Sequence, residues 1–103
     1  MDVNSLNVKK SDDGGEITID VIGTFDHQLH REFRSAYRNE DSSTSYVLNL
    51  HKAEYMDSAA LGMLLLLREH AGGEKANITI NGCRQNVKKT FEVAQFCELF
   101  TIR

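Results

Sequence analysis

The sequence lacks proline entirely and contains two cysteines, Cys83 and Cys97, among its 103 residues. Two cysteines are too few for a disulfide framework, and their spacing matches no metal-binding motif. We therefore expect reduced, buried thiols in a cytosolic protein. The absence of proline indicates nothing about function.

Long apolar runs and a strong excess of one charge are also missing. The apolar run from Leu61 to Leu67 is far shorter than the roughly 18 residues of a membrane span, and no signal peptide is recognisable at the start. The net charge is −3 and both signs are interspersed, so the sequence shows neither the basic surface typical of nucleic-acid binding nor a polybasic membrane-binding segment. We expect the partners to be proteins, with no nucleic acid and no membrane involved.

A chain of 103 residues with 41% hydrophobic residues predicts a single domain, 1–103, with a modest core. Residues 6–10 and 16–22 flank the turn cluster 11–15 and predict a β-hairpin. Further along we expect a helix at 27–38 capped by Asp26, a strand at 46–50 covered on both faces, a loop at 51–57, a helix from 58 to the glycines at 72–73, a strand at 76–81, a helix at 84–94, and a short strand or tail at 96–102.

This order of elements predicts an α/β fold, with a mixed sheet of about four to five strands and helices packed largely on one side. Parallel strands are joined by right-handed crossovers. The helix that starts at Ser58 should therefore begin at a carboxyl end of the sheet, where sites collect in such folds. The helix start at Asp26 is expected near the same edge.

Ser58 stands where the pattern changes from strand to helix, directly after Asp57. The first backbone N–H groups of a helix have no internal partner, and the helix dipole favours a hydroxyl, an anion or a phosphate there. Ser58 is thus a candidate phosphorylation site. The simpler interpretation is that Ser58 only caps the helix.

The helix after Ser58 is apolar on more than one side. Counting 100° per residue, the core side is formed by Ala60, Leu61, Leu64, Leu67 and Ala71. Met63 and Leu66 fall toward the side of Gly62. Either a neighbouring element covers these two residues, or they form an exposed apolar patch beside Ser58, as expected of a protein-docking surface.

Enzymatic and metal-binding functions find little support in the sequence. His27 and His30 are three residues apart, but no third metal ligand is suggested nearby. Ser58 as a nucleophile, with His51 or His27 as its base, would lack a nucleophile elbow of the G-x-S-x-G type. We expect neither catalysis nor a bound cofactor.

The segments VLNL at 47–50 and MDSAALG at 56–62 resemble the anti-sigma factor antagonists of the STAS domain family. The resemblance extends to the segments at 23–27 and 87–91 and to Leu99-Phe100, and so covers nearly the whole chain. In that family the serine at the position of Ser58 is phosphorylated. This chain departs from many members in having Ala59-Ala60 in place of Ser-Gly, and longer members continue into a further helix beyond the position of Arg103.

The resemblance implies a STAS-type sandwich and a partner-switching regulator. Unphosphorylated Ser58 would allow binding to an anti-sigma factor or a similar inhibitor, and phosphorylation would release it. A serine kinase of the ATP-binding anti-sigma type, which would hold the ATP and magnesium, and a PP2C-like phosphatase would act on Ser58. The expected partner-binding residues are Asp26, His27, Asp57, Ser58, Ala59, Gly62, Met63 and Leu66.

A second function remains open at this point. The alternative is that the chain is a STAS-like subunit of an ABC-type lipid transporter, which stabilises an ATPase constitutively and needs no phosphorylation. The stretch at 60–73 has a weaker resemblance to antagonists linked to motility, biofilm and general stress control.

Overall fold

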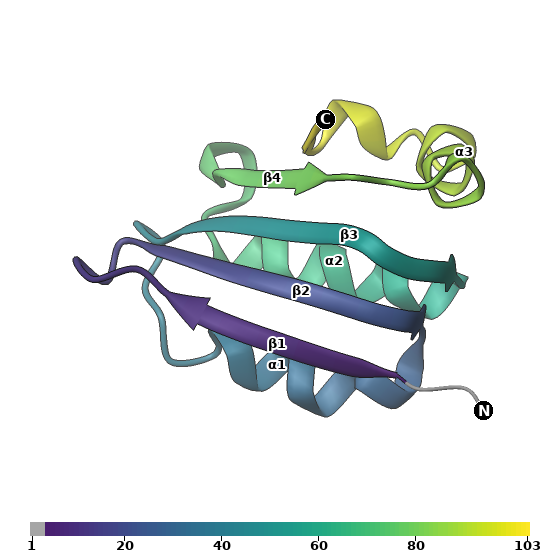
Figure 1. Cartoon of the computed structure of the whole chain (residues 1–103). Helices are drawn as coiled ribbons and strands as arrows, with labels where there is room; N and C mark the ends of the chain where they lie inside the picture. Colours follow the sequence, from purple (N-terminus) through teal and green to yellow (C-terminus); the bar gives the residue numbers. More distant parts are fainter. Residues whose placement is uncertain (1–3) are drawn as a thin grey trace.

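A computed structural model describes residues 4–103. It contains one five-stranded sheet in the order β1-β2-β3-β4-β5 (Figure 1). The strands are β1 Ser5–Lys10, β2 Glu16–Phe25, β3 Ser45–Met56, β4 Ile78–Asn81 and β5 Thr101–Ile102, and the helices are α1 His30–Tyr37, α2 Ser58–His70 and α3 Gln85–Val93. Short 3-10 turns lie at His27–Leu29, Gly73–Lys75 and Phe96–Glu98. The predicted mixed sheet with alternating helices is confirmed.

The hairpin of β1 and β2 is antiparallel, as the turn cluster predicted. Asp13 organises this turn, because its carboxylate accepts hydrogen bonds from the Ser11 hydroxyl at 2.6 Å and from the Gly15 N–H at 2.9 Å. These bonds favour the ionised form, so the pKa of Asp13 is lowered, chiefly by Ser11. Gly14 completes the turn with φ of 75°, a left-handed conformation that glycine adopts without strain.

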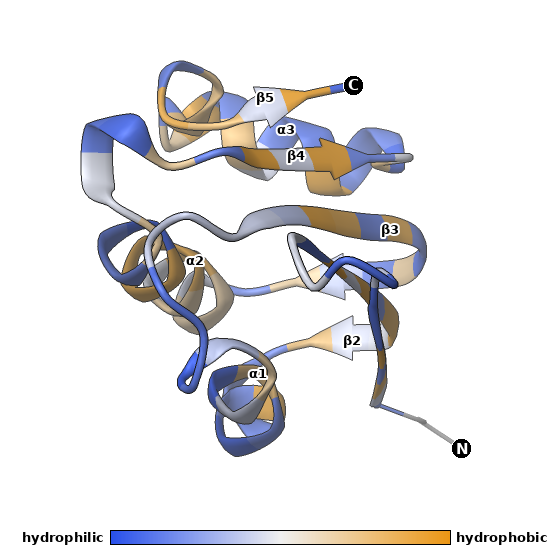
Figure 2. Cartoon of the chain, turned by 90° about the vertical axis from the view of Figure 1, so that its left-hand side faces the viewer, coloured by the Kyte–Doolittle hydropathy of each residue, from blue (hydrophilic) through white to orange (hydrophobic). Residues whose placement is uncertain are grey.

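Strands β2 to β5 run parallel to one another. Each crossover moves the chain one strand further across the sheet in the same direction. Two of the helices in these crossovers, α1 and α2, share one face of the sheet. In Figure 1, α1 and α2 lie together behind β1, β2 and β3. Figure 2 shows hydrophobic residues gathered on β3, β4 and the inner side of α2, whereas the outer turns of α1 are hydrophilic.

The opposite face of the sheet is open, which corrects the prediction that residues 46–50 are covered on both faces. Tyr46, Leu48 and Leu50 are buried against the helices, but Val47 and Asn49 are half-buried on the other side. No helix lies in front of β1, β2 and β3 in Figure 1. A polar ladder runs across this open face: the Asn49 amide donates to the Asp20 carboxylate at 2.8 Å, and the Asn81 amide donates to Asn49 at 3.5 Å.

The predicted loop at 51–57 is wrong, because β3 continues to Met56. Residues of this second half pair with β2, from Ile22 opposite Lys52 to Phe25 opposite Met56. One register shift precedes Ile22 and a second lies between Gly23 and Thr24. Only Ala53 and Met56 are buried there, so the hydrophobic alternation that marks a strand is lost. Backbone pairing with a long β2 therefore extends β3 beyond the residues that its side-chain pattern indicates.

Tyr46 should make the fold sensitive to alkaline pH. Its side chain is 1% exposed, and its hydroxyl has no hydrogen-bond partner within residues 4–103. Burial, with a smaller contribution from Glu40, raises its pKa from 10.0 to about 12. Since the unfolded chain releases this proton first, the free energy of unfolding should fall as pH rises from 10.0 toward about 12.

We expect Tyr46→Phe to reduce this alkaline loss. At pH 7 the variant should lie within about 0.5 kcal/mol of the wild type, because it removes an unpartnered buried hydroxyl. Urea unfolding across neutral and alkaline pH measures both effects, with Tyr55→Phe at an exposed tyrosine as the control. A Tyr46→Phe variant that loses stability as steeply as the wild type would contradict this assignment.

Candidate functional site

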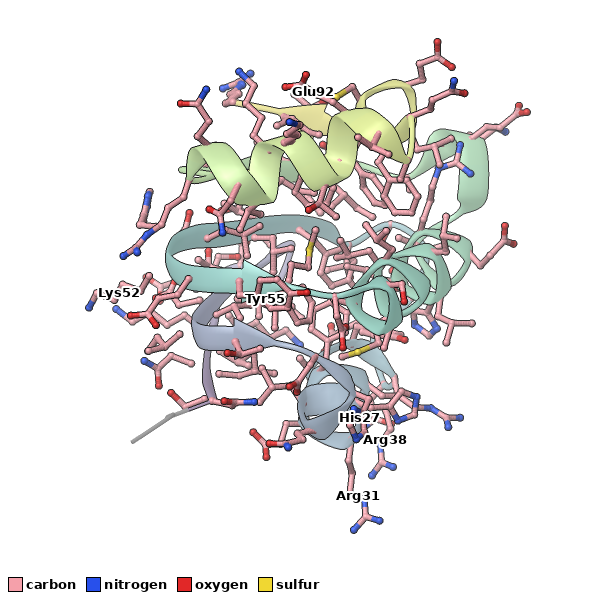
Figure 3. The ribbon with its side chains drawn as sticks, turned by 90° about the vertical axis from the view of Figure 1, so that its right-hand side faces the viewer. His27, Arg31, Arg38, Lys52, Tyr55 and Glu92 are labelled. Carbon is pink, nitrogen blue, oxygen red and sulfur yellow. The ribbon has the colours of Figure 1, made fainter. Side chains whose placement is uncertain are left out.

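Two helical segments begin side by side at one edge of the sheet. Phe25 and Met56, the last residues of β2 and β3, are register partners, and the Asp57 N–H donates to the Phe25 carbonyl at 3.3 Å. Asp26 and Asp57, the residues that follow these strands, are therefore neighbours. The prediction that both starts lie at the same carboxyl edge is confirmed, and Figure 3 views the molecule with this edge toward the reader.

Both aspartates cap the segments that follow them. The Asp57 carboxylate accepts the Ala60 N–H at 3.1 Å at the start of α2. The Asp26 carboxylate accepts the Gln28 N–H at 3.0 Å and the Asn4 side-chain amide at 3.1 Å. Each carboxylate thus satisfies a backbone donor that the start of a helix leaves unpaired.

Ser58 is the first residue of α2 and is exposed. Because Asp57 provides the cap, the interpretation of Ser58 as only an N-cap is wrong. Within residues 4–103 the Ser58 hydroxyl forms no hydrogen bond, so no intramolecular bond must break before it is modified. A phosphate there would lie at the positive end of the α2 dipole, which stabilises negative charge.

The exposed face of α2 continues from Ser58 through Ala59 and Gly62 to two leucines. Leu65 is 39% exposed and Leu66 is 54% exposed. An added Cβ on Gly62 would meet no atom within 4 Å, so this position is an open notch in the helix surface. The exposed patch that was predicted as one alternative is present, and Leu66 belongs to it.

Met63 does not belong to this patch. It is 4% exposed and forms part of the hydrophobic core, so its assignment to the exposed patch is wrong. Leu65 takes its place and was missed by the sequence analysis. The signal was available, because seven residues at 100° each bring Leu65 to within about 20° of Ser58 around the helix.

Leu61 extends the apolar surface toward α3. It lines a groove of about 420 Å³ whose other lining residues come from α3 and its C-terminus: Asn86, Lys89, Thr90, Val93 and Ala94. Val93 is 77% exposed. The Asn86 amide donates to the Glu54 carbonyl at 2.8 Å and ties the start of α3 to the last part of β3. The sequence analysis did not indicate this groove.

Two further exposed side chains complete the edge. Tyr55, near the end of β3, is 56% exposed, and His27 follows Asp26 and is exposed as well. Figure 3 labels both, with Tyr55 close to the start of α2 and His27 at the start of the α1 segment. We use the term helix-start edge for Asp26, His27, Tyr55, Asp57, Ser58, Ala59, Gly62, Leu65 and Leu66.

No group of three metal-ligating side chains occurs within residues 4–103, and neither His27 nor His51 forms a hydrogen bond with Ser58 there. His51 instead lines a cavity of about 260 Å³ on the open face of the sheet, beside Asp20 and Asn49. Among the described helices, none has the length and apolar character needed to cross a membrane.

Comparison with known proteins gives consistent matches. A family model described as "Mlab, STAS domain" matches residues 8–101. A STAS-domain containing protein of Pseudomonas aeruginosa (strain UCBPP-PA14) is 48% identical over 99 residues, which cover 95% of this chain and 98% of that protein.

Solved structures show the same fold. The anti-sigma factor antagonist SpoIIAA in its unphosphorylated form matches with a TM-score of 0.78 and 14% identity, over 96% of this chain and 88% of that one. An anti-sigma factor antagonist from Mycobacterium paratuberculosis matches with a TM-score of 0.80 and 15% identity, over 97% and 85%. The phosphorylated form of Bacillus SpoIIAA matches with a TM-score of 0.68 and 13% identity, over 96% and 91%.

The division of roles between Asp57 and Ser58 can be tested by stability. Asp57→Ala should lower the free energy of unfolding by about 1 kcal/mol, because the Ala60 N–H loses its acceptor. Ser58→Ala should change it by less than about 0.5 kcal/mol. Urea titrations followed by circular dichroism measure both, and Asp57→Asn, which keeps an acceptor oxygen, is the matched control. Equal losses for Asp57→Ala and Ser58→Ala would show that Ser58 shares the cap.

Proposed function

The chain belongs to the STAS domain family, and we propose that within it the chain acts as an anti-sigma factor antagonist that changes partners through Ser58. With Ser58 unphosphorylated, the helix-start edge binds an anti-sigma factor or a similar inhibitor and so frees what that inhibitor holds. Phosphorylation of Ser58 releases the inhibitor. The process controlled would be motility, biofilm formation or the stress response, because the stretch at 60–73 resembles antagonists linked to these processes.

The observation that carries this proposal is the position of Ser58. Its hydroxyl is exposed and is not used by the helix cap, which Asp57 provides. Next to it lie Gly62 and the exposed leucines at 65 and 66. A modifiable group beside an exposed apolar patch is suited to controlling whether that patch is covered by a partner.

The physical basis of the switch is the cost of burying charge. A phosphate adds about −1.5 to −2 charges, and the carboxylate of Asp57 stands beside it. In the free protein the phosphate is solvated and favoured by the α2 dipole, so the fold is retained. Docking would strip water from it against an apolar surface or a carboxylate, which costs several kcal/mol, and each 1.4 kcal/mol lowers affinity about tenfold.

The enzymes of the cycle would be separate proteins. A serine kinase of the ATP-binding anti-sigma type would phosphorylate Ser58 and hold the ATP and magnesium, and a PP2C-like phosphatase would remove the phosphate. The existence of both unphosphorylated and phosphorylated SpoIIAA structures with this fold supports such a cycle.

The proposal predicts phosphate on Ser58 in the native cells. Intact mass and peptide mapping should find the modification in the wild type and not in Ser58→Ala. Phosphate absent under every growth condition would instead favour a constitutive STAS subunit of an ABC-type lipid transporter. Co-purification with an ATPase, indifferent to the state of Ser58, would identify that second function.

Partner binding should depend on charge at position 58. Ser58→Ala should keep the affinity of the unphosphorylated protein for its inhibitor, and Ser58→Asp should weaken it by about tenfold or more. Ser42→Asp is the charge-matched control, because Ser42 is exposed and its carbonyl lies near Gly72, at the other end of α2. Equal affinities of Ser58→Ala and Ser58→Asp in calorimetry would refute partner switching.

A further inference from the structure

The outward side of the α1 segment collects basic residues. His27 and His30 are exposed, and so are Arg31, Arg34 and Arg38. At 100° per residue, His30 and the three arginines fall within about 100° of one another, and Glu32 falls on the other side of the helix. Figure 3 shows His27, Arg31 and Arg38 on the outer side of α1, away from the sheet. We call His27, His30, Arg31, Arg34 and Arg38 the basic stripe.

The charges of this stripe are not neutralised within the described protein. The ion pair found within residues 4–103 joins Lys10 to Glu40, and the three arginine side chains form neither an ion pair nor a hydrogen bond there. Three arginines against one glutamate give residues 30–38 a formal charge of +2 in a protein with a net charge of −3. The helix is therefore a local basic surface on an acidic molecule.

The basic stripe is continuous with the helix-start edge, because His27 belongs to both. We propose that the stripe is the part of the docking surface that receives an acidic patch of the protein partner. This inference rests on the proposed function and adds the chemistry of the partner to it. The partner would cover the apolar residues of α2 near Ser58 and place its carboxylates along α1.

The dimensions and charge of the stripe favour an acidic protein surface over a long polyanion. Arg31 to Arg38 span roughly 10 Å along the helix axis at 1.5 Å per residue, a length comparable to a Debye length at physiological salt. Membrane-binding basic clusters generally contain 4–8 lysines or arginines. A duplex or a bilayer would extend past three arginines to other parts of this acidic protein, whereas a few carboxylates on a protein surface need contact no more than the stripe.

The stripe and the phosphate would act on the same partner with opposite sign. Arginines on α1 attract carboxylates of the partner, while a phosphate on Ser58 repels the region that lies over α2. The attraction should raise the association rate, because rim charges act mainly on encounter and on its salt dependence. Binding by the unphosphorylated form would be fast at low salt and slower as salt screens the stripe.

The test uses Arg31→Gln/Arg34→Gln/Arg38→Gln in the unphosphorylated full chain. The binding partner in this test is the purified serine kinase of the ATP-binding anti-sigma type that phosphorylates Ser58. Surface plasmon resonance at about 0.05 M and about 0.5 M NaCl should show an association rate at least about tenfold below wild type at low salt, with most of the difference lost at high salt. Circular dichroism confirms folding.

A control variant separates the stripe from net charge. Lys9→Gln/Lys75→Gln/Arg103→Gln removes the same number of positive charges from exposed positions outside α1 and should keep a near-wild-type rate. Ser58-dependent binding that is equally fast in both triple variants, or equally slowed in both, would overturn the stripe and leave the proposed function standing. Binding that ignores Ser58 would remove the proposed function and the inference with it.

Two further probes test the rival occupants. Vesicles of 70:30 phosphatidylcholine and phosphatidylglycerol, and a 20-base-pair DNA duplex, should not bind the wild type at about 0.15 M salt. Binding to either that disappears in the arginine triple variant, with kinase association unchanged, would assign the stripe to a polyanion and overturn the acidic-protein proposal.

Discussion

The pairing of β2 with β3 is the constraint on which the rest of the structure depends. Its parallel register ends with Phe25 opposite Met56, and the Asp57 N–H reaches the Phe25 carbonyl across the two strands. Parallel strands require crossovers. After both β2 and β3 the chain leaves the sheet at the same edge and enters a helical segment capped by an aspartate. The two caps, the exposed serine and the start of the basic stripe are therefore brought together by backbone hydrogen bonds between β2 and β3.

The sequence predicted the element order, the mixed sheet and the meeting of the two helix starts. It succeeded where local chemistry and topology agree: Asp57 is a good cap, Ala59 and Ala60 favour helix, and right-handed crossovers determine the edge. It failed for the second half of β3, because Lys52, Glu54 and Tyr55 face solvent on a sheet with an open side. A strand held mainly by its backbone leaves little trace in hydrophobic periodicity.

The exposed apolar patch of α2 was predicted in position but not in composition. Which side of α2 is buried depends on how the helix packs in the folded protein, where Met63 is 4% exposed. Leu65 was missed although its angle from Ser58 was available from the sequence. The groove by Val93 depends on which side of α3 faces outward, whereas the outward side of α1 follows from the helical spacing of Leu29, Phe33 and Tyr37. Sequence locates a helix more readily than it orients one.

Gly62 gives the free protein less stability than its fold allows. A glycine inside a helix costs about 0.5 to 1 kcal/mol relative to alanine, and at this position a methyl group would meet nothing within 4 Å. The isolated domain therefore contains a weak point one turn after Ser58. Local opening should require less free energy in the first turns of α2 than in its buried middle. The backbone amides in the turns that present the serine should therefore exchange with solvent sooner than those in the middle of α2.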